Sequence, residues 1–451
     1  MLNTIIDGSV RNRLMIVIVL AALAVGTFLL LPQLNLDAFP DVTNVQVSIN
    51  TEAEGLAAEE VEQLITYPIE AVMYALPEVE EVRSISKTGL SMITVVFKEG
   101  TDIYFARQLV FERLQDAREQ IPGNVGTPEM GPNTSGLGQV YQYMLRTDKP
   151  DEFDAMALRS LNDWVVKLLL MPIDGVTEVL AFGGEVRQYQ VMLSPSKLLS
   201  YKLHAEDVAQ AIEENNLNAG GWYLNRGGEQ LVIRGVGWVR SGQDGIRDIG
   251  NIPVKDDAGV VVRVRDLADV QYGPEIRQGA VSITVRDKAG KPAQLGEVVT
   301  GIVMKRMGAN TKSTIDSIAE RLPIIQNALP SGVVIEAFYD QADLIDKAVT
   351  TVTKALLEAF VLIVIVLFLF LMNLRAAMLV LLSVPISIAA ALMVMSYWGM
   401  SANLMSLGGL AIAIGMMVDG SVVMMENIFK HLSHHDEEAH PQGIRHGAKG
   451  V

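Results

Sequence analysis

Two carboxylates lie at the end of a long apolar segment of this sequence. Residues 376–418 contain no charged residue, and Asp419 and then Glu426 follow them. Ionisable side chains inside a bilayer cost about 2.5–3.5 kcal/mol on insertion scales and usually mark an ion or proton path. At 100° per residue the two carboxylates lie on one face of a helix, about two turns apart. The spacing predicts a membrane helix that moves protons past Asp419, with Glu426 as a relay residue or an interfacial anchor.

Methionine is the second residue type whose placement points to chemistry. Ten of the 21 methionines fall between residues 372 and 425, among them Met405, Met417 and Met424. Thioether sulfur suits Cu(I), and by extension Ag(I), better than hard divalent ions. Met417 and Met424 are seven residues apart and share a helix face about 200° from the Asp419 stripe. The same methionines also fit ordinary apolar packing, because methionine is a common core filler.

The histidines give weaker indications of function. His204 has no cysteine and no matched nucleophile nearby, and a catalytic histidine needs partners within reach. Near the C-terminal end, a group of histidines interleaves with three acidic residues: His431, His434, His435 and His440. This group fits a transition-metal site or, as the favoured interpretation, a solvated linker. No catalytic constellation is present, so the sequence does not predict an enzyme.

Four apolar segments can position these residues in a membrane. They cover residues 14–31, 356–372, 376–398 and 404–429, and 50% of the chain is hydrophobic. The first is too long for the apolar region of a signal peptide and lacks a small-residue cleavage site, so we expect an uncleaved helix. Basic residues flank all four on one side: Arg11, Arg13, Arg375 and Lys430. By the positive-inside rule, the segment between the first two helices lies outside the cell membrane.

The large external segment has the periodicity of a repeated α+β unit. Strand patterns at 45–51, 79–86 and 92–97 alternate with helical patterns at 57–76 and 103–121, as in most of a β-α-β-β-α-β unit. A second unit begins with residues 140–183 and finishes with 297–338. Between its halves lies an insertion, residues 184–273, with strand or helix patterns at 188–193, 205–215 and 229–235. The alternative is one continuous α+β domain with long loops.

The charge and cysteine content add little to this interpretation. The formal net charge is −16 and there is no cysteine. Most of the negative charge falls in the external segment, where it favours solubility and, modestly, cations. No nucleic-acid partner is expected. The absence of cysteine is compatible with an oxidising compartment.

Several stretches resemble one transporter family. Residues 36–47 read LDAFPDVTNVQV, and the later stretches are FGGEVRQYQV at 182–191, NNLNAG at 215–220, GEQLVIRGV at 228–236 and ANLMSLGG at 402–409. Val418-Asp419-Gly420 and Glu426-Asn427 complete the set. Together they resemble the resistance–nodulation–division (RND) proton-driven pumps, in particular the heavy-metal efflux branch of CusA-like and CzcA-like proteins. The similarity extends to about His431.

This resemblance implies an α-helical membrane protein with an α+β periplasmic domain built of ferredoxin-like porter subdomains and an inserted docking subdomain. The family has twelve membrane helices in two halves, and this sequence matches the N-terminal part with the first four. The expected parts are helix one with its cytoplasmic N-terminus (1–31), the first porter subdomain (32–132), the second porter subdomain in two halves (133–183 and 274–349), the docking subdomain (184–273), helices two to four (350–430) and a truncated cytoplasmic loop (431–451).

The resemblance also implies roles for single residues. Asp419 takes the position of the family's proton-binding acid, and Glu426 with Asn427 matches its Glu-Asn pair. Met405, Met417 and Met424 match helix-four positions of the methionine ladder in copper and silver pumps. Ala413 stands where cobalt–zinc–cadmium pumps carry a second aspartate, and Ile276 replaces a periplasmic ladder methionine. Cu(I) or Ag(I) is therefore slightly preferred over Zn, Co or Cd as cargo.

The implied assembly is a homotrimer in the bacterial inner membrane, surrounded by lipid, that works with a periplasmic adaptor of the membrane fusion class and an outer-membrane channel. It would act as a secondary active transporter, a proton/metal antiporter without a resident cofactor. Three alternatives stay open: efflux of organic compounds, a truncated non-transporting scaffold, and a membrane-anchored periplasmic enzyme. Gly408, Gly409, Gly415 and Gly420 in helix four are expected at helix–helix contacts.

Overall fold

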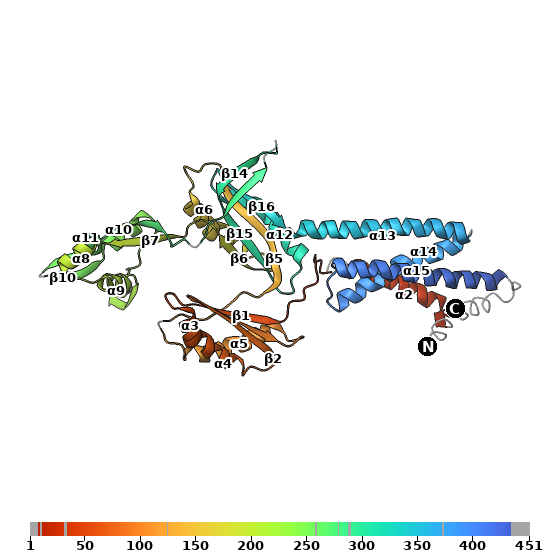
Figure 1. The fold of residues 1–451 in the computed structure, drawn as a ribbon, viewed down its shortest axis with the longest axis horizontal. Coiled ribbons are helices and arrows are strands. Elements are labelled where there is room, and N and C mark those ends of the chain that lie inside the picture. Colours follow the sequence, from red (N-terminus) through yellow and green to blue (C-terminus); the bar gives the residue numbers. More distant parts are fainter. Residues whose placement is uncertain are drawn as a thin grey trace.

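The computed structural model places three regions along one long axis (Figure 1). It describes residues 8–9, 11–30, 34–123, 125–257, 259–277, 279–286, 290–371 and 374–433. The apolar helices form one end, two α+β units form the middle, and the inserted segment forms the opposite end. Three histidines of the predicted group, His434, His435 and His440, and most of the expected loop at 431–451 lie outside the described residues, whereas His431 belongs to the last helix.

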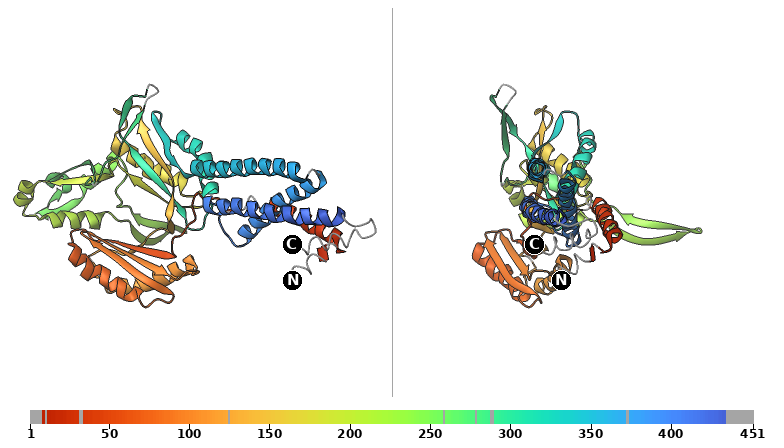
Figure 2. Two further views of the ribbon diagram at one scale, coloured as in Figure 1. Left: turned by 45° about the vertical axis from the view of Figure 1, so that its right-hand side comes forward. Right: turned by 90° about the vertical axis from the view of Figure 1, so that its right-hand side faces the viewer.

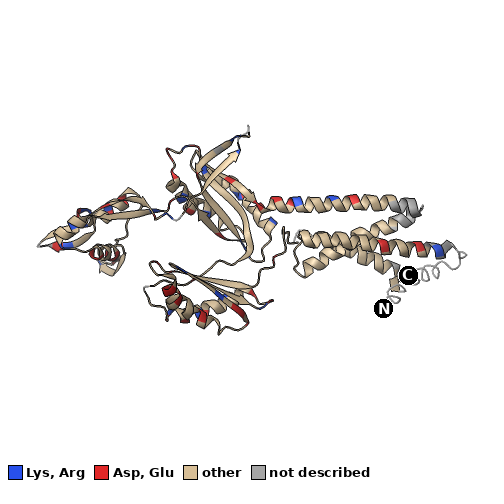
Figure 3. Ribbon diagram, in the orientation of Figure 1, with Lys and Arg blue, Asp and Glu red and all other residues tan. Residues whose placement is uncertain are grey.

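All four apolar segments predicted from the sequence form helices. They are α2 (Arg13–Leu30), α13 (Gln341–Leu371), α14 (Leu374–Tyr397) and α15 (Leu404–Ser433). Among the described residues, three windows are long and apolar enough to cross a membrane, at 341–365, 380–397 and 404–428, and a shorter apolar helix covers Leu14–Leu30. Charged residues are sparse along α2, α14, α15 and the second half of α13, but they recur along the first half of α13 and in the α+β part (Figure 3).

Helix α13 begins about fifteen residues earlier than the sequence analysis predicted, so the predicted boundary is wrong. The expected membrane helix started near residue 356, whereas α13 starts at Gln341, directly after strand β16 (Val333–Asp340). Residues 341–371 contain neither glycine nor proline, so no residue in this stretch interrupts the helix. The polar first half and the apolar second half form a single helix of 31 residues.

The first α+β unit is a four-stranded antiparallel sheet covered by helices. Its strands are β1 (Gln46–Glu52), β2 (Val79–Lys87), β3 (Leu90–Phe97) and β4 (Glu129–Met130), in the order β2-β3-β1-β4. The first helical segment comprises α3 (Ala58–Val61), a π-turn η2 (Glu62–Thr66) and α4 (Tyr67–Met73), and α5 (Ile103–Arg118) follows β3. Asp102 caps α5 by accepting a hydrogen bond from the backbone N of Phe105 at 2.9 Å.

The second α+β unit repeats this arrangement with residues from two distant stretches. Its strands are β5 (Thr134–Thr147), β6 (Val176–Phe182), β15 (Val299–Arg306) and β16, in the order β16-β5-β15-β6. Counting strands along each unit, both sheets have the order fourth, first, third, second. Its first helical segment comprises α6 (Ala155–Leu161), a π-turn η3 (Asn162–Val166) and α7 (Lys167–Leu170), and α12 (Thr311–Ala328) follows β15.

The strand predicted at 297–305 corresponds to β15, which begins two residues later, at Val299. The sequence analysis did not predict the hairpin of β13 (Ser282–Arg286) and β14 (Pro292–Glu297) that precedes it. Gly296 has a φ of 77°, in the left-handed region that favours glycine, so the chain turns there instead of continuing as one strand.

The insertion forms a small body of its own at the end of the molecule far from the apolar helices (Figure 1). The paired strands β7 (Arg187–Leu193) and β12 (Ala268–Pro274) connect it to the second unit. Between them lie α8 (Pro195–Tyr201), α9 (Ala205–Asn215), α10 (Gln243–Asn251), α11 (Val264–Leu267) and the hairpins β8–β9 (Ala219–Arg226, Glu229–Gly235) and β10–β11 (Pro253–Asp257, Val260–Arg263). The predicted patterns at 188–193, 205–215 and 229–235 correspond to β7, α9 and β9.

Candidate functional site

Helix α15 carries the two predicted carboxylates and begins with a well-defined cap. Asn403 is 6% exposed, and its side-chain oxygen accepts hydrogen bonds from the backbone N of Met405 and of Ser406, both at 3.0 Å. The Ser406 hydroxyl in turn accepts from the backbone N of Asn403 at 2.9 Å. These reciprocal bonds fix where α15 starts and therefore the rotation of every residue along it.

The rotation of α15 turns Asp419 and Glu426 away from the neighbouring helices. Val418 and Ile414 are buried against Val380 and Val384 of α14, and Phe360 of α13 packs on the same cluster. Asp419 and Glu426 are both exposed. Seven residues of helix separate them by about 10 Å along the axis. This exposure agrees with the prediction that the two carboxylates share one face. No described helix covers that face at either residue.

The three candidate methionines do not form one line. Met417 packs against the buried cluster between α14 and α15, and Met424 is half-buried. Met405 is 71% exposed in the first turn of the helix. At 100° per residue, Met405 lies about 120° around the helix from Met417, whereas Met424 lies within about 20° of it. The arrangement groups Met417 with Met424 and separates Met405 from both.

The glycines of α15 do not make the predicted helix contacts within the described structure. A Cβ atom built on Gly408, Gly409, Gly415 or Gly420 meets no atom within 4 Å. Gly415 instead borders an apolar cleft of about 380 Å3 between α13, α14 and α15. The close contact lies elsewhere: a Cβ on Gly26 of α2 would come within 2.7 Å of the Met393 side chain of α14. The sequence analysis did not single out Gly26.

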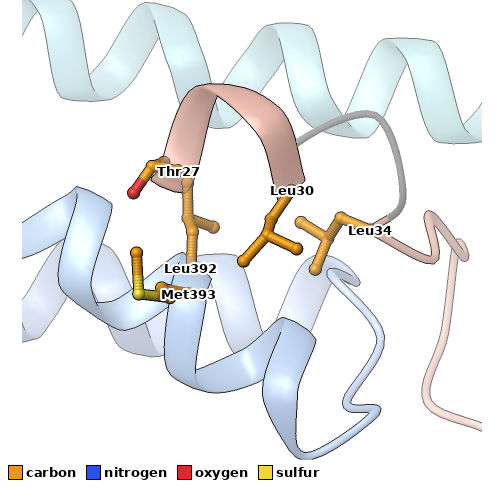
Figure 4. Close-up of a pocket in the computed structure, with 5 residues that line it drawn as sticks. All are labelled: Thr27, Leu30, Leu34, Leu392 and Met393. Carbon is orange, nitrogen blue, oxygen red and sulfur yellow. The ribbon is translucent and has the colours of Figure 1, made fainter. Parts of the chain in front are cut away.

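Helix α2 is tied to α14 by a polar contact as well. The Thr27 hydroxyl has the backbone oxygens of Leu23 and Ala389 within hydrogen-bonding distance, at 2.9 and 3.1 Å. Hydrogen bonds of this kind hold membrane helices together where water is absent. Figure 4 shows Thr27 and Leu30 of α2 facing Leu392 and Met393 of α14, with Leu34 beside them.

Sequence reasoning missed a buried polar cluster next to Leu34. Lys305, at the end of β15, is only 5% exposed, and its Nζ lies 3.5 Å from the Asp37 carboxylate. The Thr311 hydroxyl donates a hydrogen bond to the same carboxylate. A sequence signal was available, because Lys305 directly follows the apolar residues Ile302, Val303 and Met304 within the predicted strand. Its partner was not predictable, since 268 positions separate the two residues.

Asp41 lies four residues after Asp37 in the sequence, and it also interacts electrostatically with Lys305. Burial raises the pKa of its carboxyl, but neighbouring hydroxyl and backbone N–H donors and the charge of Lys305 outweigh burial and hold the pKa below its ordinary value. The backbone N of Thr43 donates to Asp41 at 3.1 Å. Asp41 therefore stays ionised beside the buried ammonium group at neutral pH.

Two other residues that the sequence analysis discussed, Ile276 and His204, lie outside the apolar helices. Ile276 is 89% exposed at a cleft of about 560 Å3 where the insertion joins the second unit. The Arg277 guanidinium in that cleft lies 3.7 Å from Glu185. His204 is the N-cap of α9, and its backbone N donates to Asp207 at 2.7 Å. The part of the chain that the structure describes holds no group of three or more His, Cys, Asp or Glu arranged for a metal ion.

Comparison with known proteins gives a consistent result. A sequence model of the AcrB/AcrD/AcrF family matches residues 2–451. The cobalt-zinc-cadmium resistance protein CzcA of Cupriavidus metallidurans is 40% identical over 443 residues, which cover 97% of this chain and 40% of CzcA. The cation efflux system protein CusA of Escherichia coli K12 is 36% identical over 434 residues, covering 96% of this chain and 40% of CusA.

A comparison with solved structures identifies the same kind of protein as the sequence comparison. A crystal structure described as a heavy metal efflux pump superposes with a TM-score of 0.81 at 34% identity, covering 96% of this chain and 42% of that one. The chain thus spans about two fifths of the length of the proteins it matches.

Proposed function

Because the chain belongs to the AcrB/AcrD/AcrF family, and within the RND superfamily to the heavy-metal efflux branch of CusA-like and CzcA-like proteins, we propose that it forms the N-terminal part of a proton-driven metal-cation efflux pump. The proposed transport is antiport: metal cations leave the cell envelope while protons enter. Asp419 is the proposed proton-binding residue and Glu426 the proposed relay toward the cytoplasm.

One observation carries this proposal: an exposed carboxylate in the middle of an apolar helix. Asp419 lies within the apolar window 404–428 and points away from the packed face of α15. A carboxylate in such a place is costly unless a partner or a water-filled path reaches it. Two turns further on, Glu426 offers a second acceptor for a proton on the same face.

The test is metal tolerance and transport by the complete protein that carries this chain. Asp419→Asn keeps the size of the side chain but removes its ability to bind and release a proton. We expect this variant to lose proton-driven metal transport in proteoliposomes and to accumulate metal in cells. A matched control is Asp343→Asn on the polar half of α13, which removes an exposed carboxylate outside the apolar segment.

Cells are challenged separately with Cu and Ag and with Zn, Co and Cd. Full transport by the Asp419→Asn variant would remove the proton role from this residue. Export of dyes or detergents without any effect of metals would replace the metal proposal with efflux of organic compounds. We propose Cu(I) and Ag(I) as the first cargo to test, because Met417 and Met424 share a face and Ala413 is not acidic. The similar identities to CzcA and CusA favour neither metal class.

We propose that the two α+β units are ferredoxin-like porter subdomains and that the insertion is a docking subdomain. The equal strand order of the two sheets and the equal place of the π-turns support the first assignment. The position of the insertion, far from the apolar helices, supports the second. We also propose that α2 crosses the membrane with α13, α14 and α15, since a span needs about 17–25 apolar residues. The membrane is then the bacterial inner membrane.

The hairpin β8–β9 supports the proposed homotrimer. It projects beyond the rest of the molecule (Figure 2, right), and nearly all of its residues are exposed. Trp222 is 85% and Val232 70% exposed. An isolated two-stranded hairpin is at best marginally stable in water. A second copy of the chain that covers this arm would bury both its apolar side chains and its strand edges.

A substitution on the arm tests this assembly. Trp222→Asp should weaken subunit association by about 2 kcal/mol, because a tryptophan anchor of an interface carries energy of this size. Light scattering in detergent over a dilution series measures the oligomer mass. Gln230→Asp on the same hairpin introduces the same charge at a polar position and should leave the mass unchanged. An unaltered mass for both variants would contradict the role of the arm. The periplasmic adaptor and the outer-membrane channel remain proposed partners of the trimer.

A further inference from the structure

The segment that follows helix α2 lies between the apolar helices and the second α+β unit. We define the linker as residues 34–41. On the side of the helices, Leu34 is 6% exposed and packs with Met395 of α14 and Ala402. Leu36 and Ala402 form a parallel bridge. The linker thus lies against the outer ends of α14 and α15.

Backbone hydrogen bonds join the linker to the start of α15. The N of Ala402 donates to the O of Asn35 at 2.8 Å, and the N of Asp37 donates to the O of Ala402 at 3.3 Å. The N of Leu404, the first residue of α15, reaches the O of Ala38 at 3.4 Å. These bonds pair the linker with the residues that cap α15, so a shift of this helix end would pull directly on the linker.

The other side of the linker is held by the second α+β unit. The Asp37 carboxylate accepts a hydrogen bond from Thr311, the first residue of α12, and pairs with Lys305 of β15. The side-chain N of Asn310 donates to the O of Leu34 at 3.2 Å. Asp37 therefore contacts both regions: its backbone N is bonded to the membrane side and its carboxylate to the periplasmic side.

The pairing of Asp37 with Lys305 is suited to fixing geometry. The side chains of Lys305 and Asp37 are 7% and 16% exposed. A buried ion pair adds little net stability compared with an apolar pair of the same shape, but removal of one partner leaves an uncompensated buried charge. Lys305 also donates to the backbone O of Ala309 at 2.9 Å, which holds the ammonium group in place. The contact thus resists any sliding of the linker past β15.

Helix α15 connects this contact to the proposed proton site. It is one continuous helix from Leu404 to Ser433. Asp419 lies fifteen residues from its outer end, or about 22 Å along the axis. A rigid helix that carries a binding site at one point and a fixed contact at another can transmit a displacement between them.

We propose that Asp37 is a positioning residue that couples protonation in helix α15 to movement of the second α+β unit. The inference rests on the proposed function, because it assumes that Asp419 changes its protonation during transport. A displacement of α15 would move its cap at Ala402–Asn403, the linker would follow, and Asp37 would pass the movement to β15 and α12 through Lys305 and Thr311.

The experiment measures that movement directly in the complete protein, reconstituted in nanodiscs. This chain contains no cysteine, so spin labels can be attached at Glu320→Cys on α12 and Trp398→Cys before α15, with any cysteine outside these 451 residues replaced. Both positions are exposed. The distance between the labels is compared with and without Asp419→Asn, which mimics a protonated carboxyl. Asp37→Asn is then added to both.

We expect Asp419→Asn to shift the label distance when Asp37 is intact and to produce a clearly smaller shift in the Asp37→Asn variant, in which only the direct connection from β16 to α13 remains. Metal transport by the Asp37→Asn variant should fall about tenfold, a usual size for allosteric coupling, while proton entry through Asp419 persists. Thr311→Val removes a single hydroxyl from the same contact and should reduce the shift without loss of folding. A purely structural role of Asp37 would lower the yield of folded protein but leave the shift unchanged.

A control pair lies on the second connection between these regions. Lys312 of α12 lies 3.0 Å from Asp346 of α13. Asp346→Asn breaks this more exposed contact and should alter neither the shift nor the transport rate. An undiminished shift in the Asp37→Asn variant, or no shift with Asp37 intact, would overturn the inference. If Asp419→Asn left metal transport intact, the proposed function would fail instead, whatever the linker variants did.

Discussion

The two α+β units share a strand order and an interrupted first helix, yet each contains a buried polar cluster that connects it to a different part of the chain. In the first unit, the Thr66 hydroxyl lies 2.8 Å from the hydroxyls of Ser86 and of Ser91. These residues are 20 and 25 positions from Thr66 and belong to the same unit. In the second unit, Lys305 and Thr311 reach Asp37, which is more than 260 positions away.

This difference in contacts means that the first unit is stabilised from within, whereas the second unit is attached to the apolar helices. The polar contacts of the first unit close its own helix onto its own hairpin, so they stabilise that unit internally. The second unit is bonded to the linker and continues directly from β16 into α13. A movement of the apolar helices therefore reaches the second unit through two connections. The predictions below test whether the two units depend on these groups in the way that the contacts indicate.

The largest effect is expected for Asp37→Ala, which leaves Lys305 buried without its carboxylate. Loss of one partner of a buried ion pair costs about 3 kcal/mol. Hydrogen exchange of the complete protein should show faster opening of the second unit, with the first unit unchanged. Addition of Lys305→Met should restore most of the protection, because it removes the buried charge. Equal loss of protection in both units would contradict the assignment.

A swap at the last residue of each π-turn should give a smaller effect. Thr66→Val leaves the hydroxyl of Ser91, which is fully buried, without this partner, at a cost of about 2 kcal/mol to the first unit. Val166→Thr places a hydroxyl in the apolar cluster of the second unit, and we expect about 1 kcal/mol. We expect Val166→Thr to cost less than Thr66→Val because the new hydroxyl can donate to a backbone carbonyl that the π-turn leaves within reach. The Thr66 hydroxyl donates to the O of Val61 in this way.

Thermal unfolding followed by hydrogen exchange in each unit measures both changes. A greater loss for Val166→Thr than for Thr66→Val would show that the hydroxyl cluster of the first unit is dispensable.

The smallest effect is expected for Tyr143→Phe in the second unit. The Tyr143 hydroxyl donates to the side-chain O of Asn162 at 2.7 Å, and loss of one such bond costs about 1 kcal/mol. Burial raises the pKa of Tyr143, and the Asp163 carboxylate adds to this. A folded-state pKa above the unfolded value of about 10 leaves the stabilisation complete below that pH. The difference in unfolding free energy between the unsubstituted protein and the Tyr143→Phe variant should therefore stay constant from about pH 6 to 9.

Denaturant titration of the two proteins across this pH range checks the prediction. A difference that declined between neutral pH and pH 9 would mean that the phenol ionises there, contrary to its burial.

Local pattern predicted most of the fold. The strand at 229–235 and the helix at 205–215 match β9 and α9, because alternation and helical periodicity are read over a few residues. The placement of Asp419 and Glu426 on one face also followed from helix geometry, whereas their exposure is a result of how α15 packs. The ion pair between Asp37 and Lys305 did not, since it depends on how distant parts of the chain meet.

Two other features escaped the sequence for related reasons. The π-turns at 62–66 and 162–166 add a residue to one turn of a helix without disturbing the apolar pattern on either side. The glycines of α15 matched a packing pattern, yet no described helix packs on them. Local pattern identifies a face that can make contact, but it does not identify the partner.

The unbroken helix α13 acts as a lever. Its 31 residues span about 46 Å, from the last strand of the second unit to the far end of the apolar bundle. Because no glycine or proline provides a hinge, a tilt at the membrane end is carried to the other end undiminished. A rotation of about 5° displaces the far tip by about 4 Å on a rod of this length. The displaced tip is Gln341, which directly follows β16, so the last strand of the second unit would move with it.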